Sequence, residues 1–245
     1  MEAPNIIREI SRSLVEADWS DPLSTVGLFQ AIYRLFAFGN KDYYVLHGSA
    51  ALTSRGTTVM FGDDGRSTRG KTVCAVELAL ASQLFVCDEY VLFQVESGQV
   101  FANPHRPIHF KGITANHLKM VHNVDVGNQA LVSPGALFQL VDKSILSLIV
   151  IPRLVSTLRF TSNLEEVGGQ ERLEILRACA FGHLAKLVNP ELDRSSLITR
   201  AYRDCAVNME EVLSSFPLVD LSVRLYRANL AVPCDIVPLL EKEGY

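Results

Sequence analysis

The chain has 245 residues, of which 48% are hydrophobic, and its formal net charge at pH 7 is −4. The length and the apolar content suffice for a well-packed globular core, and the negative charge argues against the basic surface of a nucleic-acid-binding protein. No apolar run approaches the roughly 20 residues of a membrane helix, and the N-terminus lacks the pattern of a signal peptide. We therefore expect a cytoplasmic protein that binds neither nucleic acid nor membrane and that is compatible with homo-oligomerisation.

Five cysteines occur, at positions 74, 87, 179, 205 and 234. Their number is odd, and their spacing matches no metal-ligand pattern. Reduced core thiols, as in most cytoplasmic proteins, are therefore expected.

The first 40 residues are expected to form a helical cover over one side of the core. Apolar residues recur at helical spacing within residues 5–17 and again within residues 23–38. Residues 19–22 carry the break that separates the two predicted helices.

Residues 41–160 carry the pattern of a nucleotide-binding core. The turn sequence Ser54-Arg55-Gly56 lies between two apolar runs and predicts a β-hairpin that ends at Phe61. A helix is expected over residues 72–82, and the segment 103–135, rich in His, Pro and Asn, is expected to be mostly loops. The expected strands are 43–46, 57–61, 84–87, 90–95, 100–102, 144–152 and 154–160.

Residues 161–245 are expected to add helices and strands to the same unit. Periodic leucines predict a helix over residues 171–188, and residues 190–215 also have helical character. One or two strands are expected within 217–226, and a closing helix within 234–242. Because no linker-like composition separates these parts, we predict a single domain over residues 1–245.

The most informative stretch follows the apolar run that ends at Phe61. The residues Gly65-Arg66-Ser67-Thr68-Arg69-Gly70-Lys71-Thr72 satisfy the phosphate-loop pattern G-x-x-x-x-G-K-[ST]. In such a loop, backbone N–H groups and a helix N-terminus hold phosphate oxygens. The lysine neutralises the β- and γ-phosphates, and the following hydroxyl binds Mg²⁺. We therefore expect ATP and Mg²⁺ to bind here, with Arg66 and Arg69 either reaching the phosphates or staying solvated.

Two acids follow the next apolar run. Asp88 and Glu89 come directly after Leu84–Cys87, 17 and 18 residues beyond Lys71. Carboxylates at a strand end beside a phosphate loop either hold Mg²⁺ or accept the proton of an attacking hydroxyl. Asp88 is therefore predicted to be the proton acceptor or a metal ligand, and Glu89 a metal residue of smaller effect.

Four segments of the chain resemble the HPr kinase/phosphorylase catalytic domain and its kinase-like relatives. They are Leu46-His47-Gly48, the loop from Gly62 to Thr72, Phe85-Val86-Cys87-Asp88-Glu89 and Pro107-Ile108-His109-Phe110-Lys111-Gly112. The resemblance covers about residues 43–113. It implies an α/β fold of the PEP-carboxykinase-like P-loop type, with a mixed β-sheet flanked by helices. His47, beside a glycine at a strand end, is expected to act in catalysis by orienting Asp88 or the γ-phosphate.

The chain also departs from that family's pattern. The second acid is Glu89 where an Asp is usual, and the last segment has His109 and Lys111 where the family has Glu and Arg. Either Gly62 or Gly65 opens the phosphate loop, because three extra residues lie in this stretch. These departures favour a kinase of another substrate over phosphorylase activity or recognition of HPr.

Further cations and histidines are candidates for substrate contacts. Lys111 and Arg153 are plausible phosphate-neutralising cations, and His109 is a candidate substrate-binding residue. The histidines at 105, 109, 117 and 122 are numerous enough for a metal site, but their spacings match no zinc pattern. We therefore expect most of them on surface loops.

Together these features predict an ATP-dependent kinase that phosphorylates a hydroxyl on a small molecule or a short peptide. The polar and cationic residues of segment 103–135 suit such an acceptor better than a folded protein surface, which would call for an apolar patch. Two alternatives stay open: a protein serine kinase of the HPr kinase type, and a nucleotide-binding regulator with little or no catalysis. The absence of a guanine-reading N-K-x-D sequence disfavours an ordinary P-loop GTPase.

Overall fold

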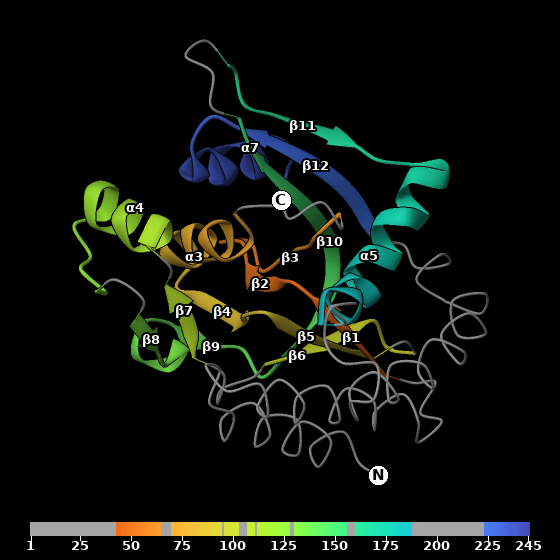
Figure 1. The fold of residues 1–245 in the computed structure, drawn as a ribbon, viewed down its shortest axis with the longest axis horizontal. Coiled ribbons are helices and arrows are strands. Elements are labelled where there is room, and N and C mark those ends of the chain that lie inside the picture. The colour runs from red at the N-terminus through yellow and green to blue at the C-terminus, as the bar shows by residue number, and fades with distance from the viewer. Residues whose placement is uncertain are drawn as a thin grey trace.

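A computed structural model describes residues 43–64, 70–94, 96–102, 107–110, 112–127, 130–155, 160–187 and 223–245. The two helices expected in the first 40 residues and the helical segment expected at 190–215 lie outside these ranges. Within them the protein has an α/β architecture, in which helices flank a mixed β-sheet (Figure 1).

The described strands form one large sheet and one small one. The large sheet contains β1 (Tyr43–His47), β2 (Ser49–Leu52), β3 (Thr58–Phe61), β4 (Leu84–Cys87), β5 (Tyr90–Gln94), β6 (Gln99–Phe101), β9 (Gln139–Leu140), β10 (Lys143–Leu154), β11 (Asn163–Glu166) and β12 (Arg224–Leu230). Its order is β1-β5-β6-β10-β3-β2-β4-β9, and β12 lies between β10 and β11. The small sheet pairs β7 (Ile108–Phe110) with β8 (Ala130–Val132).

Strand directions bring several strand ends to one edge of the large sheet. β3 and β12 both run parallel to β10, whereas β2 is antiparallel to both of its neighbours, β3 and β4. β3, β4 and β10 therefore point the same way, and β2 begins where they end. The register agrees, because Ser49 lies opposite Phe61 and Ala50 opposite Cys87. We call this place the carboxyl edge.

β10 joins the two halves of the large sheet. Its first residues, Lys143–Ile145, pair antiparallel with β6, and its later residues pair in parallel with β3 on one side and β12 on the other. Its centre, Leu148–Ile151, is fully buried. A near-continuous apolar run of this kind is typical of a strand that is covered on both faces.

Helices cover both faces of the sheet (Figure 1). Val59 and Phe61 of β3 belong to the same core cluster as α3 (Lys71–Ser82) and α7 (Ile236–Lys242). The opposite face packs against α5 (Gly169–Leu187), whose Cys179 reaches the chain just beyond β3. The remaining helical segments are α4 (Gly112–His122) and the 3₁₀ turns η1 (Pro134–Ala136) and η3 (Pro233–Asp235). A side chain on either face is therefore removed from water. For a large apolar residue, this burial stabilises the folded state by about 1.5–3 kcal/mol.

Most of the described elements agree with the sequence prediction. The hairpin is β2–β3, and α3, β4, β5, β6, β10 and α5 lie within one or two residues of their predicted positions. β1 runs directly into β2 but pairs with β5, in the far half of the sheet. The closing helix is present as η3 followed by α7.

Two predictions about the elements are wrong. The segment 103–135 is not mostly loops, since it contains β7, α4 and β8. Among the α4 residues whose side chains the structure describes, the buried apolar ones are Ala115 and Leu118. Polar residues outnumber them, so composition alone favours a loop over a helix here. The C-terminal strand runs over Arg224–Leu230 rather than ending at Tyr226, because it pairs along its whole length with β10.

The connection from β1 to β2 allows no side chain at Gly48. A Cβ there would lie 2.6 Å from the Phe61 carbonyl oxygen and 2.7 Å from the Met60 Cε. The Gly48 N–H also donates to the Glu89 carbonyl, at 3.1 Å. The glycine thus lets three strand ends approach one another closely.

Gly48→Ala is expected to lower the free energy of unfolding by about 1–3 kcal/mol, the usual cost of overpacking. Urea denaturation checks this. Gly168→Ala is the matched control, because no atom lies within 4 Å of the added Cβ and its backbone needs no positive φ. The control should stay within about 0.5 kcal/mol of the wild type. Equal stability of the two variants would contradict the close approach at Gly48.

Candidate functional site

The chain leaves β3 through Gly62 and enters α3 through Gly70. The Gly62 N–H donates to the Val150 carbonyl at 2.9 Å, which extends the alignment of β3 with β10 by one residue. A Cβ on Gly62 would lie 2.6 Å from the Cys179 Sγ, so a side chain does not fit there. Gly70 has φ 125°, a conformation that favours glycine. Gly65, Arg66, Ser67, Thr68 and Arg69, all predicted phosphate contacts, lie outside the described residues.

Asp88 is the centre of one group of side chains at the carboxyl edge. It follows β4 and is only 1% exposed. The Thr72 hydroxyl donates to its Oδ1 at 3.0 Å, and the Ser49 hydroxyl donates to the same oxygen. The structure therefore brings together two of the predicted metal residues, Thr72 and Asp88, from α3 and β4. These two hydroxyls replace part of the hydration that a buried carboxyl group loses.

Asp63 is the centre of a second group, directly beyond Gly62. Its carboxylate accepts a hydrogen bond from the Lys71 Nζ at 2.9 Å and lies 3.7 Å from the His47 Nδ1. Asp63 is only 2% exposed, so an opposite charge close by offsets much of the cost of burying it. The Cys179 thiol donates to the backbone carbonyl of the same residue at 3.3 Å. The predicted catalytic residues His47 and Lys71 therefore meet at a carboxylate that the sequence did not single out.

Arg153 also reaches the loop that follows β3. Its guanidinium donates to the Asp64 carboxylate at 2.8 Å, across 89 residues of sequence. The arginine comes from the end of β10, the central strand of the carboxyl edge. Arg153, a predicted phosphate-neutralising cation, therefore lies at the loop after β3, where it pairs with the Asp64 carboxylate.

Three further predicted residues have different outcomes. Glu89 has φ 62°, and its carbonyl accepts the hydrogen bond from Gly48, so the acid pair ends β4 in a tight turn. His109 lies opposite Leu131 in the small sheet, and no hydrogen bond or ion pair joins it to the described residues of the carboxyl edge. Lys111 lies outside the described residues.

The thiols near the edge are unsuited to nucleophilic chemistry. Burial is the main cause that raises the pKa of the Cys179 thiol to about 12. Burial, reinforced by the charge of Asp88, also raises the pKa of the Cys87 thiol. Since the thiolate is the reactive form, both cysteines act as core residues, as the sequence predicted.

Sequence reasoning missed three side chains at this edge. Ser49 begins β2, and Asp63 and Asp64 were treated as loop residues without a role. Their partners come from other strands, so only the strand order reveals the pairing. The sequence nevertheless offered one signal for the two acids. Asp63 and Asp64 are adjacent in a loop that is expected to bind an anion.

The prediction that most histidines lie on surface loops is wrong: His105 lies outside the described residues, His109 is part of β7, and the other two lie on a helix. His117 and His122 lie on α4, and each makes a hydrogen bond to the buried carboxylate of Glu77 on α3. This group is separate from the two groups of the carboxyl edge.

Comparison with known proteins gives no match, whether with family models, with curated proteins or with solved structures. Among the helices of the described ranges, none has both the length and the apolar character required to cross a membrane.

If the loop binds ATP, as the sequence predicts, Asp63→Asn is expected to raise the affinity for ATP by roughly tenfold, or about 1.4 kcal/mol. The change keeps the shape but removes a negative charge that holds Lys71 and repels phosphate oxygens. Calorimetry at constant ionic strength measures the effect. Asp125→Asn is the control, since Asp125 pairs with Lys119 at a largely exposed position. A loss of affinity in the Asp63 variant would instead show that this carboxylate holds Lys71 in its binding position.

Proposed function

We propose that the protein is an ATP-dependent kinase that transfers the γ-phosphate to a hydroxyl group of a small molecule or a short peptide. The observation that carries the proposal is the 3.0 Å hydrogen bond from the Thr72 hydroxyl to the Asp88 carboxylate. A hydroxyl after the loop lysine and a strand-end aspartate are the side chains that hold Mg²⁺ in P-loop NTPases. Here they lie together although 16 residues of sequence separate them.

The donors at this position fit Mg²⁺. The ion prefers oxygen ligands and is usually bound by one or two carboxylates together with substrate phosphates. Thr72 and Asp88 offer such oxygens, and Glu89 follows Asp88 within the tight turn that ends β4. When bound, the ion would neutralise charge that develops on the phosphates during transfer.

The remaining residues supply positioning and charge. The Lys71 ammonium binds β- and γ-phosphate oxygens once it leaves Asp63, and the N-terminus of α3 offers N–H groups to the same phosphates. Asp88 takes the proton of the acceptor hydroxyl or, as a metal ligand, holds the reacting groups in place. His47 lies beside Asp63, where it can orient the γ-phosphate. Little covalent chemistry is required of the protein, because positioning and electrostatics dominate phosphoryl transfer.

Strand order supports assignment to the HPr kinase-like group with a PEP-carboxykinase-like fold. The antiparallel β2 separates the strand before the phosphate loop from the strand that ends in Asp88. A doubly wound parallel sheet has no such strand in this position. The His47-Gly48 pair also reaches the edge, through the hydrogen bond from Gly48 to the Glu89 carbonyl. These features favour the kinase-like relatives over an ordinary P-loop NTPase.

One observation favours the alternative of a nucleotide-binding regulator. Loop carboxylates hold both the Lys71 ammonium and the Arg153 guanidinium. A nucleotide must displace these pairs, which suits a switch whose state changes on binding. Turnover of ATP with and without an acceptor separates the two functions.

Lys71→Ala is expected to lower the affinity for ATP with Mg²⁺ at least roughly 100-fold, or about 2.8 kcal/mol. The variant loses the cation that binds the β- and γ-phosphates. Calorimetry on the full chain measures the change. Lys119→Ala, at a largely exposed position on α4, is the matched control and should bind as the wild type does. Equal affinity of the two variants would exclude the phosphate-loop assignment.

Asp88→Asn is expected to lower phosphoryl transfer at least roughly 100-fold, the usual effect of losing a general base. Affinity for ATP should change little, because Asp88 acts on the metal or the acceptor. Glu89→Gln is the neighbouring control and should have the smaller effect. The assay follows radiolabel from ATP into pools of small hydroxyl compounds, short peptides and folded proteins, with HPr among them.

The same assay separates the remaining alternatives. Labelling of HPr alone would identify a protein serine kinase of the HPr kinase type. It would contradict the proposal that the acceptor is a small molecule or a short peptide. Hydrolysis or binding without transfer to any acceptor would favour the regulator. Near-normal transfer by the Asp88 variant would remove Asp88 from the chemistry.

A further inference from the structure

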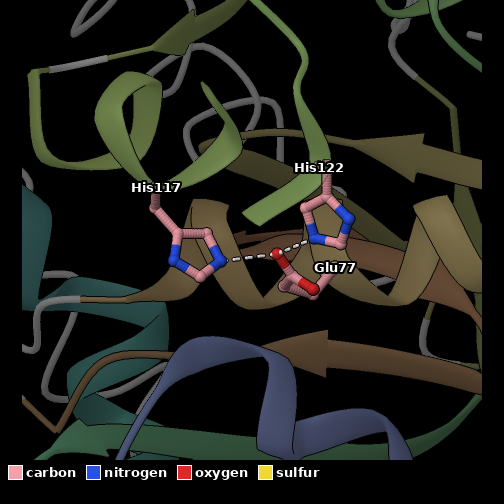
Figure 2. Close-up of side chains that lie close together, drawn as sticks. All are labelled: Glu77, His117 and His122. Carbon is pink, nitrogen blue, oxygen red and sulfur yellow. Dashed lines mark hydrogen bonds and ion pairs between the residues drawn. The ribbon is translucent and has the colours of Figure 1, made fainter. Parts of the chain in front are cut away.

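A second cluster of polar side chains lies between α3 and α4, away from the carboxyl edge. The Nε2 atoms of His117 and His122 lie 2.7 Å and 2.8 Å from the same oxygen, Oε1, of Glu77. Figure 2 shows the two imidazole rings reaching the carboxylate from opposite sides. The three potential ligand atoms all lie within 4.8 Å of one another.

The end of α4 brings the two histidines to one carboxylate. Residues five apart point roughly 140° away from each other around an ideal helix, so the two rings approach Glu77 from two directions rather than stacking. His122 is the last residue of α4, and Asn123 then adopts φ 55°. The Val124 N–H donates to the Leu118 carbonyl and fixes this turn. The position of the His122 ring is therefore determined by backbone contacts as well as by the carboxylate.

Glu77 is an unusual residue for its position. Its neighbours Val76 and Leu78 belong to the hydrophobic core, and Glu77 itself is only 3% exposed. A buried carboxylate is costly unless charges or donors compensate it. Two imidazoles whose coordinating nitrogens meet at one carboxylate oxygen form a donor set that binds a transition metal in many proteins.

We propose that Glu77, His117 and His122 bind one zinc ion. Two imidazole nitrogens and one carboxylate oxygen are ligands of Zn²⁺, whereas Mg²⁺ and Ca²⁺ require mostly oxygen ligands. The site differs in donors and position from the Mg²⁺ site proposed at Thr72 and Asp88. The inference does not depend on the proposed kinase activity.

The two distances from the Glu77 oxygen require only a small adjustment. Zinc bonds of roughly 2.0–2.1 Å in a tetrahedral arrangement place ligand atoms roughly 3.3 Å apart. The present separations from Oε1, 2.7 Å and 2.8 Å, are those of hydrogen bonds and widen by about half an ångström when the ion enters. A nitrogen that binds the metal carries no proton, so any proton on Nε2 is released to solvent as the ion enters. Because the His122 side chain is 29% exposed, a water molecule can take the fourth position.

Such an ion would fasten α4 to α3. Glu77 comes from α3 and both histidines from α4, which the sequence places 40 or more residues later. α3 begins with Lys71 and Thr72, while α4 follows the segment that carries β7. The zinc ion would therefore have a structural role, because it would join two helices that are far apart in the sequence.

The first experiment measures zinc binding to the full chain. Chelator-treated protein is dialysed against zinc chloride, and affinity is measured by competition with a chromophoric chelator. One ion per chain is expected, with an affinity at least roughly 100-fold lower in Glu77→Gln and in His122→Gln, since loss of a residue that merely orients a ligand already costs 10–100-fold. The amide side chain in His122→Gln can still donate a hydrogen bond to Glu77. If the cluster only forms hydrogen bonds, the wild type would bind no zinc and the variant would be as stable as the wild type.

Cys234→Ser is the matched control, because this half-buried thiol is near Glu77. After burial, the charge of Glu77 is the next cause that raises the pKa of the Cys234 thiol. Its zinc affinity should equal that of the wild type. Zinc binding that is lost in this control but retained in the Glu77 and His122 variants would overturn the proposal. Magnesium chloride that competes as well as zinc would overturn it too.

X-ray absorption at the zinc edge of the wild-type protein needs no variant and therefore does not depend on how the variants fold. The expected first shell contains only nitrogen and oxygen at roughly 2.0–2.1 Å, with the outer-shell signature of two imidazoles. A sulfur ligand, or a sub-stoichiometric signal without imidazoles, would exclude this site.

Discussion

The carboxyl edge depends on the burial of two carboxylates, Asp63 and Asp88, which are 2% and 1% exposed. An ionised group is removed from water only where partners replace its hydration. Lys71 compensates Asp63, and the hydroxyls of Ser49 and Thr72 bond to Asp88. These partners come from β2 and α3, so the sheet and the helix must assemble around the carboxylates together. The same arrangement leaves cations and acids side by side, and the proposed binding of phosphate would require the cations to exchange these partners.

Local patterns predicted the elements whose signal lies within one segment. α3 has an apolar face that includes Val73 and Val76, and β4 is an uninterrupted apolar run before Asp88. α4 was missed because segment 103–135 is rich in His, Pro and Asn, although Ala115 and Leu118 lie three residues apart and are both buried. The end of the C-terminal strand was misplaced for a similar reason, since pairing with β10 extends it through Arg227 to Leu230. Strand order, with β2 between β3 and β4, depends on long-range pairing and has no signature within a short window.

The same distinction between local sequence signals and long-range pairing applies to the site residues. The spacing of Gly70, Lys71 and Thr72 fixes a loop before a helix, and an acid after a buried strand is a strong signal in any α/β chain. Ser49 could not be found that way, because its role depends on lying opposite Phe61 across a strand pair. Glu77 did carry a signal, an acid between core residues of a helix, but its partners arrive from a segment that was expected to be loop.

The position of β10 in the sheet has a consequence for synthesis of the chain. β3 is complete at residue 61, whereas its partner β10 begins at residue 143 and pairs with β12 only after residue 224. At translation rates of roughly 5–20 residues per second, one edge of β3 waits roughly 4–16 s for its neighbour on the ribosome. An apolar strand with unpaired N–H and C=O groups invites pairing with other chains. The nascent protein therefore passes through a stage in which one edge of β3 is unpaired and open to pairing with other chains.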